Sequence, residues 1–123
     1  MIPKEEYEFA EINVPSEVNR NIVCQNPRSA YFYALLTDKK SRDDTRKAAC
    51  GDPFFAYWYA KNIDKHARDD TREAACTKSF EAYLYARDVD EELRIDTWLA
   101  VKNTEYENKY RKLFNDSIKE LII

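Results

Sequence analysis

Alanine and aromatic residues form one pattern, Ala-Tyr-x-Tyr-Ala, in three segments of the chain. The segments are 30–34, 56–60 and 82–86, with Phe, Trp and Leu in turn at the variable position. In the second segment Ala56, Tyr59 and Ala60 fall on one side of an α-helix, and Ile63 extends this stripe by a turn. Further aromatic residues flank the stripe, so the helix is apolar almost all round. Such a helix is buried on several sides, and we expect each one to lie between two neighbouring units.

A polar segment follows each apolar one, and its sequence also repeats. Residues 42–50 read Arg-Asp-Asp-Thr-Arg-Lys-Ala-Ala-Cys, and residues 68–76 differ only in having Glu in place of Lys. The longer segments 26–50 and 52–76 share 15 of 25 residues without a gap, and a weaker copy covers 78–102. A fixed period of 26 residues is the signature of a repeat architecture. We therefore predict three repeats, each a pair of antiparallel helices.

Capping residues indicate where the helices begin and end. Asn26 and Asp52 each precede a proline, and this order favours a capped helix start because the side chain accepts from free backbone N–H groups. Ser41 and Asp44 are expected to cap the second helix of the first repeat in a similar way. Gly51 is the only glycine of the chain, and we expect it to take the left-handed conformation that often ends a helix.

The two ends of the chain depart from the repeat and are expected to close the stack. Residues 1–25 are a degenerate N-terminal cap with a charged outer face, which an end unit needs because no neighbour covers it. At the other end, apolar residues recur at helical spacing from Tyr106 to Ile122, which predicts a longer capping helix over 104–122. The sequence thus predicts a single all-α domain, a short α-solenoid of antiparallel pairs with about seven helices.

The segments 52–65 and 82–90 resemble a tandem helical repeat found in bacteriophage and some bacterial proteins. Its pattern is roughly Asp-Pro-x-x-Ala-Tyr-x-Tyr-Ala-Arg-Asp-Val, and the resemblance covers residues 26 to about 101. It implies a helical fold and a phage origin, and it implies no catalytic residues. Small phage proteins of this kind often bind and disable a host protein, so the resemblance implies an inhibitor, including one of a host defence system.

The size and charge of the chain narrow the classes of function. A length of 123 residues fits one domain, and a content of 44% hydrophobic and 35% charged residues is typical of a folded chain. The formal net charge of −3 argues against a binder of duplex nucleic acid, which needs a basic surface. We see no secretion signal and no apolar run that could span a membrane. A cytoplasmic location is expected, in the host cell if the protein is phage-encoded.

Residues that could carry chemistry are few. Cys24, Cys50 and Cys76 recur every 26 positions, and equivalent positions of stacked helices lie roughly 8–10 Å apart, too far for a disulfide. The single His66 gives no partner set for zinc. Adjacent acids on a helix point about 100° apart, so the repeated Asp pairs each offer one ligand per face. With no glycine-rich loop and no Ser/His/Asp set, we expect a protein that is not an enzyme and binds no cofactor or metal.

Binding of another protein is the function that the residue pattern favours. The candidate binding residues recur at equivalent repeat positions: Tyr31, Tyr57, Tyr83, Trp58, Arg42, Arg46, Arg68 and Arg72. The aromatic ladders either lie in the core or line a groove, and the arginines form either exposed ion pairs or a stripe for an acidic partner. The alternative is a nucleic-acid or nucleotide binder that uses both stripes, which the net charge disfavours. The oligomeric state stays open, and an exposed Leu121–Ile123 would indicate self-association through the C-terminal helix.

Overall fold

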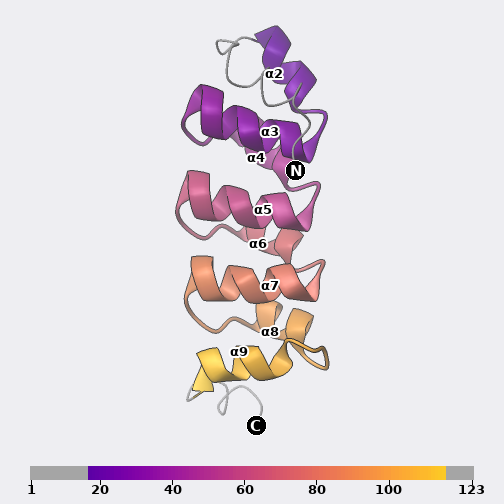
Figure 1. Ribbon diagram of the computed structural model, residues 1–123, viewed down its shortest axis with the longest axis vertical. Helices are drawn as coiled ribbons and strands as arrows, with labels where there is room; N and C mark the ends of the chain where they lie inside the picture. Colours follow the sequence, from indigo (N-terminus) through magenta and orange to yellow (C-terminus); the bar gives the residue numbers. More distant parts are fainter. Residues whose placement is uncertain (1–16, 116–123) are drawn as a thin grey trace.

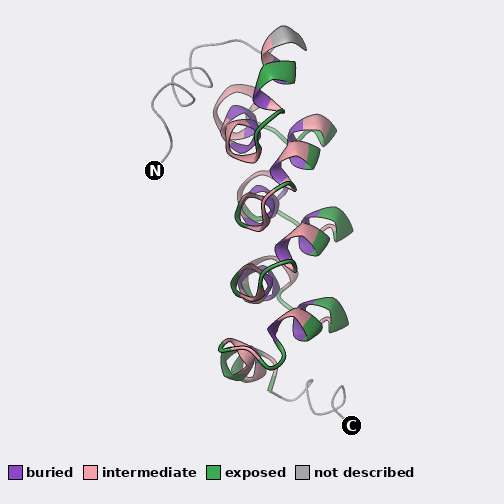
Figure 2. Ribbon diagram, turned by 90° about the vertical axis from the view of Figure 1, so that its right-hand side faces the viewer, coloured by how far each residue is buried: buried purple, intermediate pink, exposed green. Residues whose placement is uncertain are grey.

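The helices stack in two columns in the computed structural model, which describes residues 17–115 (Figure 1). The first column consists of α3 (Pro27–Tyr33), α5 (Pro53–Tyr59), α7 (Ser79–Tyr85) and α9 (Glu107–Leu113). Behind it lie α4 (Asp43–Ala49), α6 (Asp69–Ala75) and α8 (Ile95–Val101), and α2 (Glu17–Val23) lies above α3. Figure 2 shows the two columns side by side. No strand occurs between residues 17 and 115, and neighbouring helices pack in pairs, so the predicted short α-solenoid is confirmed.

Each repeat's first helix ends in a short π-helical segment followed by a left-handed residue. The segments are η1 (Ala34–Asp38), η2 (Ala60–Asp64) and η3 (Ala86–Asp90). The residues that follow them, Lys39, Lys65 and Glu91, have φ values of 56°, 61° and 54°. The prediction for Gly51 is wrong, because it has no positive φ. Three left-handed residues fall instead where the chain reverses from the first helix to the second, and a fourth, Asn103 with φ 63°, stands at the position of Gly51 in the third repeat.

The helix starts follow the sequence in the first column and not in the second. The Asn26 side chain accepts a hydrogen bond from the backbone N–H of Ser29 at 3.1 Å. The Asp52 side chain accepts one from the backbone N–H of Phe54 at 2.8 Å. Both predicted caps are confirmed. The predicted Ser41 cap is wrong, because α4 begins after the extended residue Arg42, whose side chain makes no capping bond. The second helices therefore need another partner for their first backbone groups.

The core runs along the stack as a series of clusters, each between neighbouring units. Alanines of the first helices, at positions 30, 34, 56, 60, 82 and 86, are fully buried, as are Ala49 and Ala75 of the second helices. Small side chains let the two helices of a repeat approach closely, and large tyrosines fill the space between repeats. The predicted stripe of Ala56, Tyr59 and Ala60 is confirmed, since all three are fully buried.

A buried tyrosine joins each first helix to the second helix of the repeat before it. The Tyr59 hydroxyl lies 2.7 Å from the Thr45 hydroxyl, accepts from the backbone N–H of Arg42 at 3.0 Å and donates to its carbonyl at 3.1 Å. Tyr85 makes the same three bonds to Thr71 and to the backbone of Arg68. Within the second helices, the side chains of Asp44 and Asp70 accept from the next backbone N–H at 2.7 and 2.8 Å. The tyrosine hydroxyls add partners for the backbone of the residue at which each of these helices starts.

A buried ion pair forms the second link between repeats. Arg46 donates from Nε and Nη2 to the Asp64 carboxylate, with Nη2 2.7 Å from Oδ1. Arg72 holds Asp90 in the same way, and its Nη2 also lies 2.7 Å from the carboxylate. The guanidinium of Arg46 also lies 5.7 Å from the centre of the Tyr59 ring. Each arginine thus contacts both the acid and the tyrosine of the next repeat.

The C-terminal helix α9 differs from the predicted capping helix. Its bounds are Glu107–Leu113, whereas the prediction began at 104 and ended at 122. The predicted part from 116 to 122 lies outside the described residues, as does most of the N-terminal cap 1–25. Within the described residues, α9 takes the place of a fourth first helix at the lower end of the first column (Figure 1).

The contacts of α9 keep one of the two links between repeats and replace the other. Tyr110 lies 2.7 Å from the Thr97 hydroxyl and donates to the backbone carbonyl of Arg94 at 3.2 Å, so the hydroxyl link is kept. Trp98 stands where the earlier repeats have the buried arginine, with its ring centre 5.8 Å from that of Tyr110. The Arg111 guanidinium lies 5.1 Å from the Trp98 ring centre. Ring packing therefore replaces the ion pair at this end of the stack.

Removing the tyrosine hydroxyl should destabilise the protein. Tyr85→Phe leaves the partly buried backbone N–H of Arg68 and the buried hydroxyl of Thr71 without the tyrosine oxygen, so we expect a loss of about 1–3 kcal/mol in the free energy of unfolding. Urea denaturation, monitored by circular dichroism, measures this change in the free energy of unfolding. The control Tyr106→Phe, on a partly exposed ring, should change stability by less than about 0.5 kcal/mol. Equal effects of the two changes would contradict the role of the buried hydroxyl.

Breaking the ion pair on one side should cost more than removing both partners. The side chains of Arg46 and Asp64 are 7% and 0% exposed, so Arg46→Ala leaves a buried carboxylate and should cost about 3–5 kcal/mol. Replacing both, as Arg46→Met with Asp64→Leu, removes both charges and should cost clearly less. A double-mutant cycle in urea tests this, and additive losses would argue against coupling between the two residues.

Candidate protein-binding face

Aromatic rings surround a shallow hollow on the first column of helices. The hollow, of about 290 Å³, is lined by Tyr31, Phe32, Phe54, Phe55 and Trp58, from α3 and α5. Phe32 and Phe55 meet edge to face with ring centres 6.4 Å apart, as do Phe54 and Trp58 at 5.6 Å. The rings therefore form the walls of a recess rather than a stack of parallel plates.

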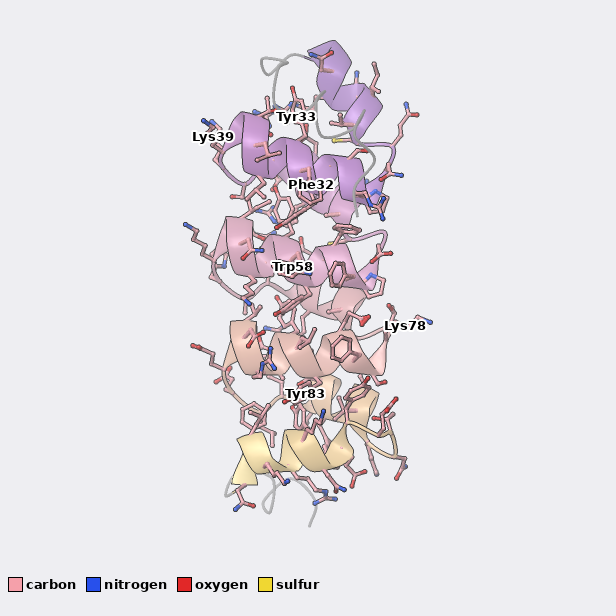
Figure 3. All side chains as sticks on the ribbon, viewed as in Figure 1. Phe32, Tyr33, Lys39, Trp58, Lys78 and Tyr83 are labelled. Atoms are coloured by element: carbon pink, nitrogen blue, oxygen red, sulfur yellow. The ribbon has the colours of Figure 1, made fainter. Side chains whose placement is uncertain are left out.

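A second group of rings continues this surface toward the C-terminus. Phe80 and Tyr83 from α7 lie with their ring centres 5.3 and 6.1 Å from that of Tyr106. In Figure 3, Phe32, Trp58 and Tyr83 lie one below the other on the front of the first column. We call the hollow together with Phe80, Tyr83 and Tyr106 the aromatic face. Phe54 and Phe80 are 41% and 43% exposed, so large apolar groups on it contact solvent.

Cations lie over the rings of the aromatic face. The Lys61 Nζ lies 5.5 Å from the Trp58 ring centre, and the Arg87 guanidinium lies 5.6 Å from that of Tyr83. Arg28 and Lys109 lie over Phe55 and Tyr106 at 5.9 Å each. Cation–π contacts of this kind hold a charged group at the edge of an apolar surface. Four cations thus lie beside the rings of the aromatic face, although the whole chain has a formal net charge of −3.

One acid of this surface is neutralised by its neighbours. Arg87 donates to both oxygens of Asp88, at 2.7 and 2.8 Å, and the Tyr57 hydroxyl also donates to this carboxylate. The bond from Arg87 lowers the pKa of Asp88, and burial raises the pKa of Tyr57. Asp88 is thus ionised at neutral pH, and it pairs closely with Arg87 and more distantly with Lys61, whose Nζ lies 3.8 Å from its Oδ2.

The predicted tyrosine ladder is mostly interior. Tyr31 and Tyr57 are 4% and 3% exposed, and Tyr83 is half-buried. The Tyr31 hydroxyl accepts from the Asn62 amide of the next repeat at 2.9 Å, so it also joins two repeats. Of the predicted aromatic binding residues, Trp58 and Tyr83 present ring surface to solvent, and Tyr31 contributes to the floor of the hollow.

The arginine stripe, one of the two alternatives for these residues, does not form. Arg46 and Arg72 are buried, at 6% and 4% exposed, because each inserts between two repeats toward its acid. Arg42 and Arg68 are at the starts of α4 and α6 in the second column, where each pairs locally, Arg68 with Asp70 at 3.1 Å. None of the four adjoins the aromatic face. The expectation of exposed ion pairs is therefore correct for Arg42 and Arg68 and wrong for Arg46 and Arg72.

Phenylalanines of the aromatic face were not among the predicted binding residues. Phe54 and Phe80 occupy the same repeat position, one residue beyond the proline position, and Phe55 follows the first of them. Their sequence signal was available, since an aromatic residue there lies outside the buried Ala-Tyr stripe. Lys61 was also missed, and only its distance from Trp58 shows that it belongs to this surface.

The described residues offer little for covalent or metal chemistry. Cys24, Cys50 and Cys76 are free and half-buried, so the predicted absence of a bond among them holds. Burial raises the pKa of Cys50 to about 11, so at neutral pH this side chain stays protonated as the unreactive thiol. In residues 17–115 no three acid, histidine or cysteine side chains gather as a metal site would require. No helix of this part has both the length and the apolar character needed to cross a bilayer.

Comparison with known proteins does not assign this chain to a family. No protein-family model matches the chain, and neither a curated protein nor a solved structure matches it. The resemblance to a phage repeat, and the inhibitor role that it implies, therefore stay predictions.

The thiols should react slowly in the folded protein. A rise of the Cys50 pKa from 9.0 to about 11 lowers its thiolate fraction at neutral pH about 100-fold. We expect a disulfide reagent such as 5,5′-dithiobis(2-nitrobenzoate) to label the native protein slowly at neutral pH, and all three thiols at once in urea. Labelling of the folded protein as fast as that of the unfolded chain would show that the cysteines are accessible and reactive.

Proposed function

We propose that this protein is a non-enzymatic binding module that holds a segment of another protein on its aromatic face. The observation that carries the proposal is the hollow of Tyr31, Phe32, Phe54, Phe55 and Trp58 with its rim of cations. The partner segment is acidic and carries an apolar anchor residue. Both properties follow from the composition of the face.

The apolar anchor follows from the lining of the hollow. Its walls are aromatic rings from two repeats, and the exposed Phe54 stands at its edge. Rings in edge-to-face contact leave a recess that suits one aliphatic or aromatic side chain. Aromatic side chains in such positions are typical anchors of protein interfaces, where a few buried groups dominate the affinity.

The acidic character of the partner follows from the charges beside the hollow. Four cations lie over rings of the face: Arg28, Lys61, Arg87 and Lys109. The carboxylate that lies among them, Asp88, is already paired with Arg87. Lys61 lies farther from Asp88, at 3.8 Å against 2.7 Å for Arg87, so a carboxylate of the partner would compete with Asp88 for Lys61 at the rim. Complementary charges of this kind favour the encounter and its register.

A protein segment fits the aromatic face better than a nucleic acid does. Single-stranded nucleic acid is bound by aromatic platforms on which bases stack, inside a positive groove that follows the backbone. Here the rings of the hollow meet edge to face, and the arginines at positions 46 and 72 lie inside the stack. The experiment below also tests the alternative that the aromatic face binds nucleic acid.

Peptide selection tests both properties of the partner segment. Full-length protein is used to select from a library of random displayed peptides, with Trp58→Leu as the counter-selection. Leu occupies this position in the third repeat, so the variant should fold. We expect enriched peptides that combine Asp or Glu with Leu, Phe or Trp, and a loss of affinity of at least about tenfold in Trp58→Leu.

A second pair of variants tests the charge and the location. Lys61→Glu should weaken the selected peptides, and added salt should weaken them in the wild type. Glu73→Lys, which places the first repeat's residue on the outer side of α6, is the matched control and should leave affinity unchanged. The proposal fails if selection enriches nothing, if the peptides bind Trp58→Leu equally, or if an oligothymidine displaces them and binds more tightly.

A further inference from the structure

A second hollow lies at the boundary between the first and second repeats, and lysines surround it. It has a volume of about 210 Å³ and lies between η1 and η2. Lys39 and Lys40 line it from the first repeat, and Asn62, Ile63 and Lys65 line it from the second. We call it the lysine hollow. All three lysines are exposed, and no acid lines the hollow among residues 17–115.

These three lysines have no acid of their own within the described part of the chain. No ion pair joins any of them to another residue from 17 to 115. The neighbouring acids, Asp38 and Asp64, are buried and pair inward with Arg20 and Arg46. Like charges gathered at a hollow attract an ion of the opposite sign, so the lysine hollow suits an anionic group of a ligand.

The corresponding hollow between the second and third repeats has balanced charges. Its cations are accompanied by two acids of the third repeat, Asp88 and Glu91. Glu91 has the left-handed backbone conformation that Lys39 and Lys65 have in the earlier repeats. The boundary between the first and second repeats therefore combines the hollow of aromatic rings with unbalanced positive charge, and the next boundary does not.

The lysine hollow and the aromatic hollow are neighbours on the first column. Tyr31 lines the aromatic hollow, and its hydroxyl accepts a hydrogen bond at 2.9 Å from the amide of Asn62, which lines the lysine hollow. In Figure 3, Trp58 lies in the middle of the column and Lys39 at its left-hand edge. Lys65 follows Trp58 by seven residues, which is about 10 Å along a helix. About three residues of an extended peptide span that distance.

We infer that the lysine hollow holds an acidic side chain of the partner segment, two to four residues from the apolar anchor in the aromatic hollow. The inference rests on the proposed function and adds to it the place of the acid and the register of the segment. Unlike Lys61, the lysines of this hollow need not be drawn from an acid of the same chain. At the opposite end of the boundary Asp52 stands beside Arg28. The acid therefore lies on one side of the anchor only.

Peptides selected from the random displayed library with full-length protein test this register. When they are aligned on their apolar anchor, we expect Asp or Glu two to four residues away, always on the same side. The variant Lys39→Glu with Lys65→Glu has the residue of the third repeat at both positions, so it should fold, and it should bind these peptides at least about tenfold more weakly. The control Lys47→Glu with Lys78→Glu makes the same change in charge at exposed positions away from both hollows and should bind within about twofold of the wild type.

Charge reversal in the peptide tests the pairing itself. A selected peptide whose acids at these positions are replaced by lysine should bind the Lys39→Glu, Lys65→Glu variant at least about tenfold more tightly than it binds the wild type. Circular dichroism of each variant confirms that it is folded. Peptides that need Trp58 but have acids at no fixed spacing, or that bind the lysine variant as tightly as the wild type, overturn this inference and leave the proposed function standing. Peptides that bind Trp58→Leu as well as the wild type overturn both.

Discussion

The structure depends on a buried tyrosine hydroxyl that completes the helix of a neighbouring repeat. The second helices start at Arg42, Arg68 and Arg94, none of which caps its helix with its own side chain. In each case a tyrosine from the next unit bonds to the backbone at that start, and α9 supplies it for the third repeat. Because backbone groups at a helix start need partners, the start of each second helix is fully bonded only once the following first helix has docked. The repeats are therefore built to fold together.

Much of the interior is constant between repeats, and one of the positions that differ lies on the aromatic face. The buried alanines and tyrosines of the first helices and the threonines of the second are the same in all three units, whereas the position of Trp58 holds Phe32 in one neighbour and Leu84 in the other. The aromatic face, which we assign to binding, contains such a variable position.

Local patterns in the sequence determined much of the fold. The 26-residue period, the caps at Asn26 and Asp52 and the burial of the Ala-Tyr stripe could all be predicted, because each depends on neighbours within one helix or on a direct repeat. The candidate site was predicted in part, through Trp58 and Tyr83. Phe54 and Phe80 were missed although they stand outside the Ala-Tyr stripe, and only the packed structure shows that they remain 41% and 43% exposed.

Only the tertiary structure decided which charged residues are buried and which partners they have. In sequence, Arg46 has an obvious partner three positions earlier, Asp43, and the structure keeps that contact at 2.7 Å. Its dominant partner is Asp64, which lies 18 residues further along the chain and is brought close by the stacking of the next repeat. Whether a charge is solvated or buried depends on what packs over it, and for a solenoid that is the next repeat. The sequence by itself therefore determined the helices and their order, and the packing between repeats decided which side chains were left for a partner.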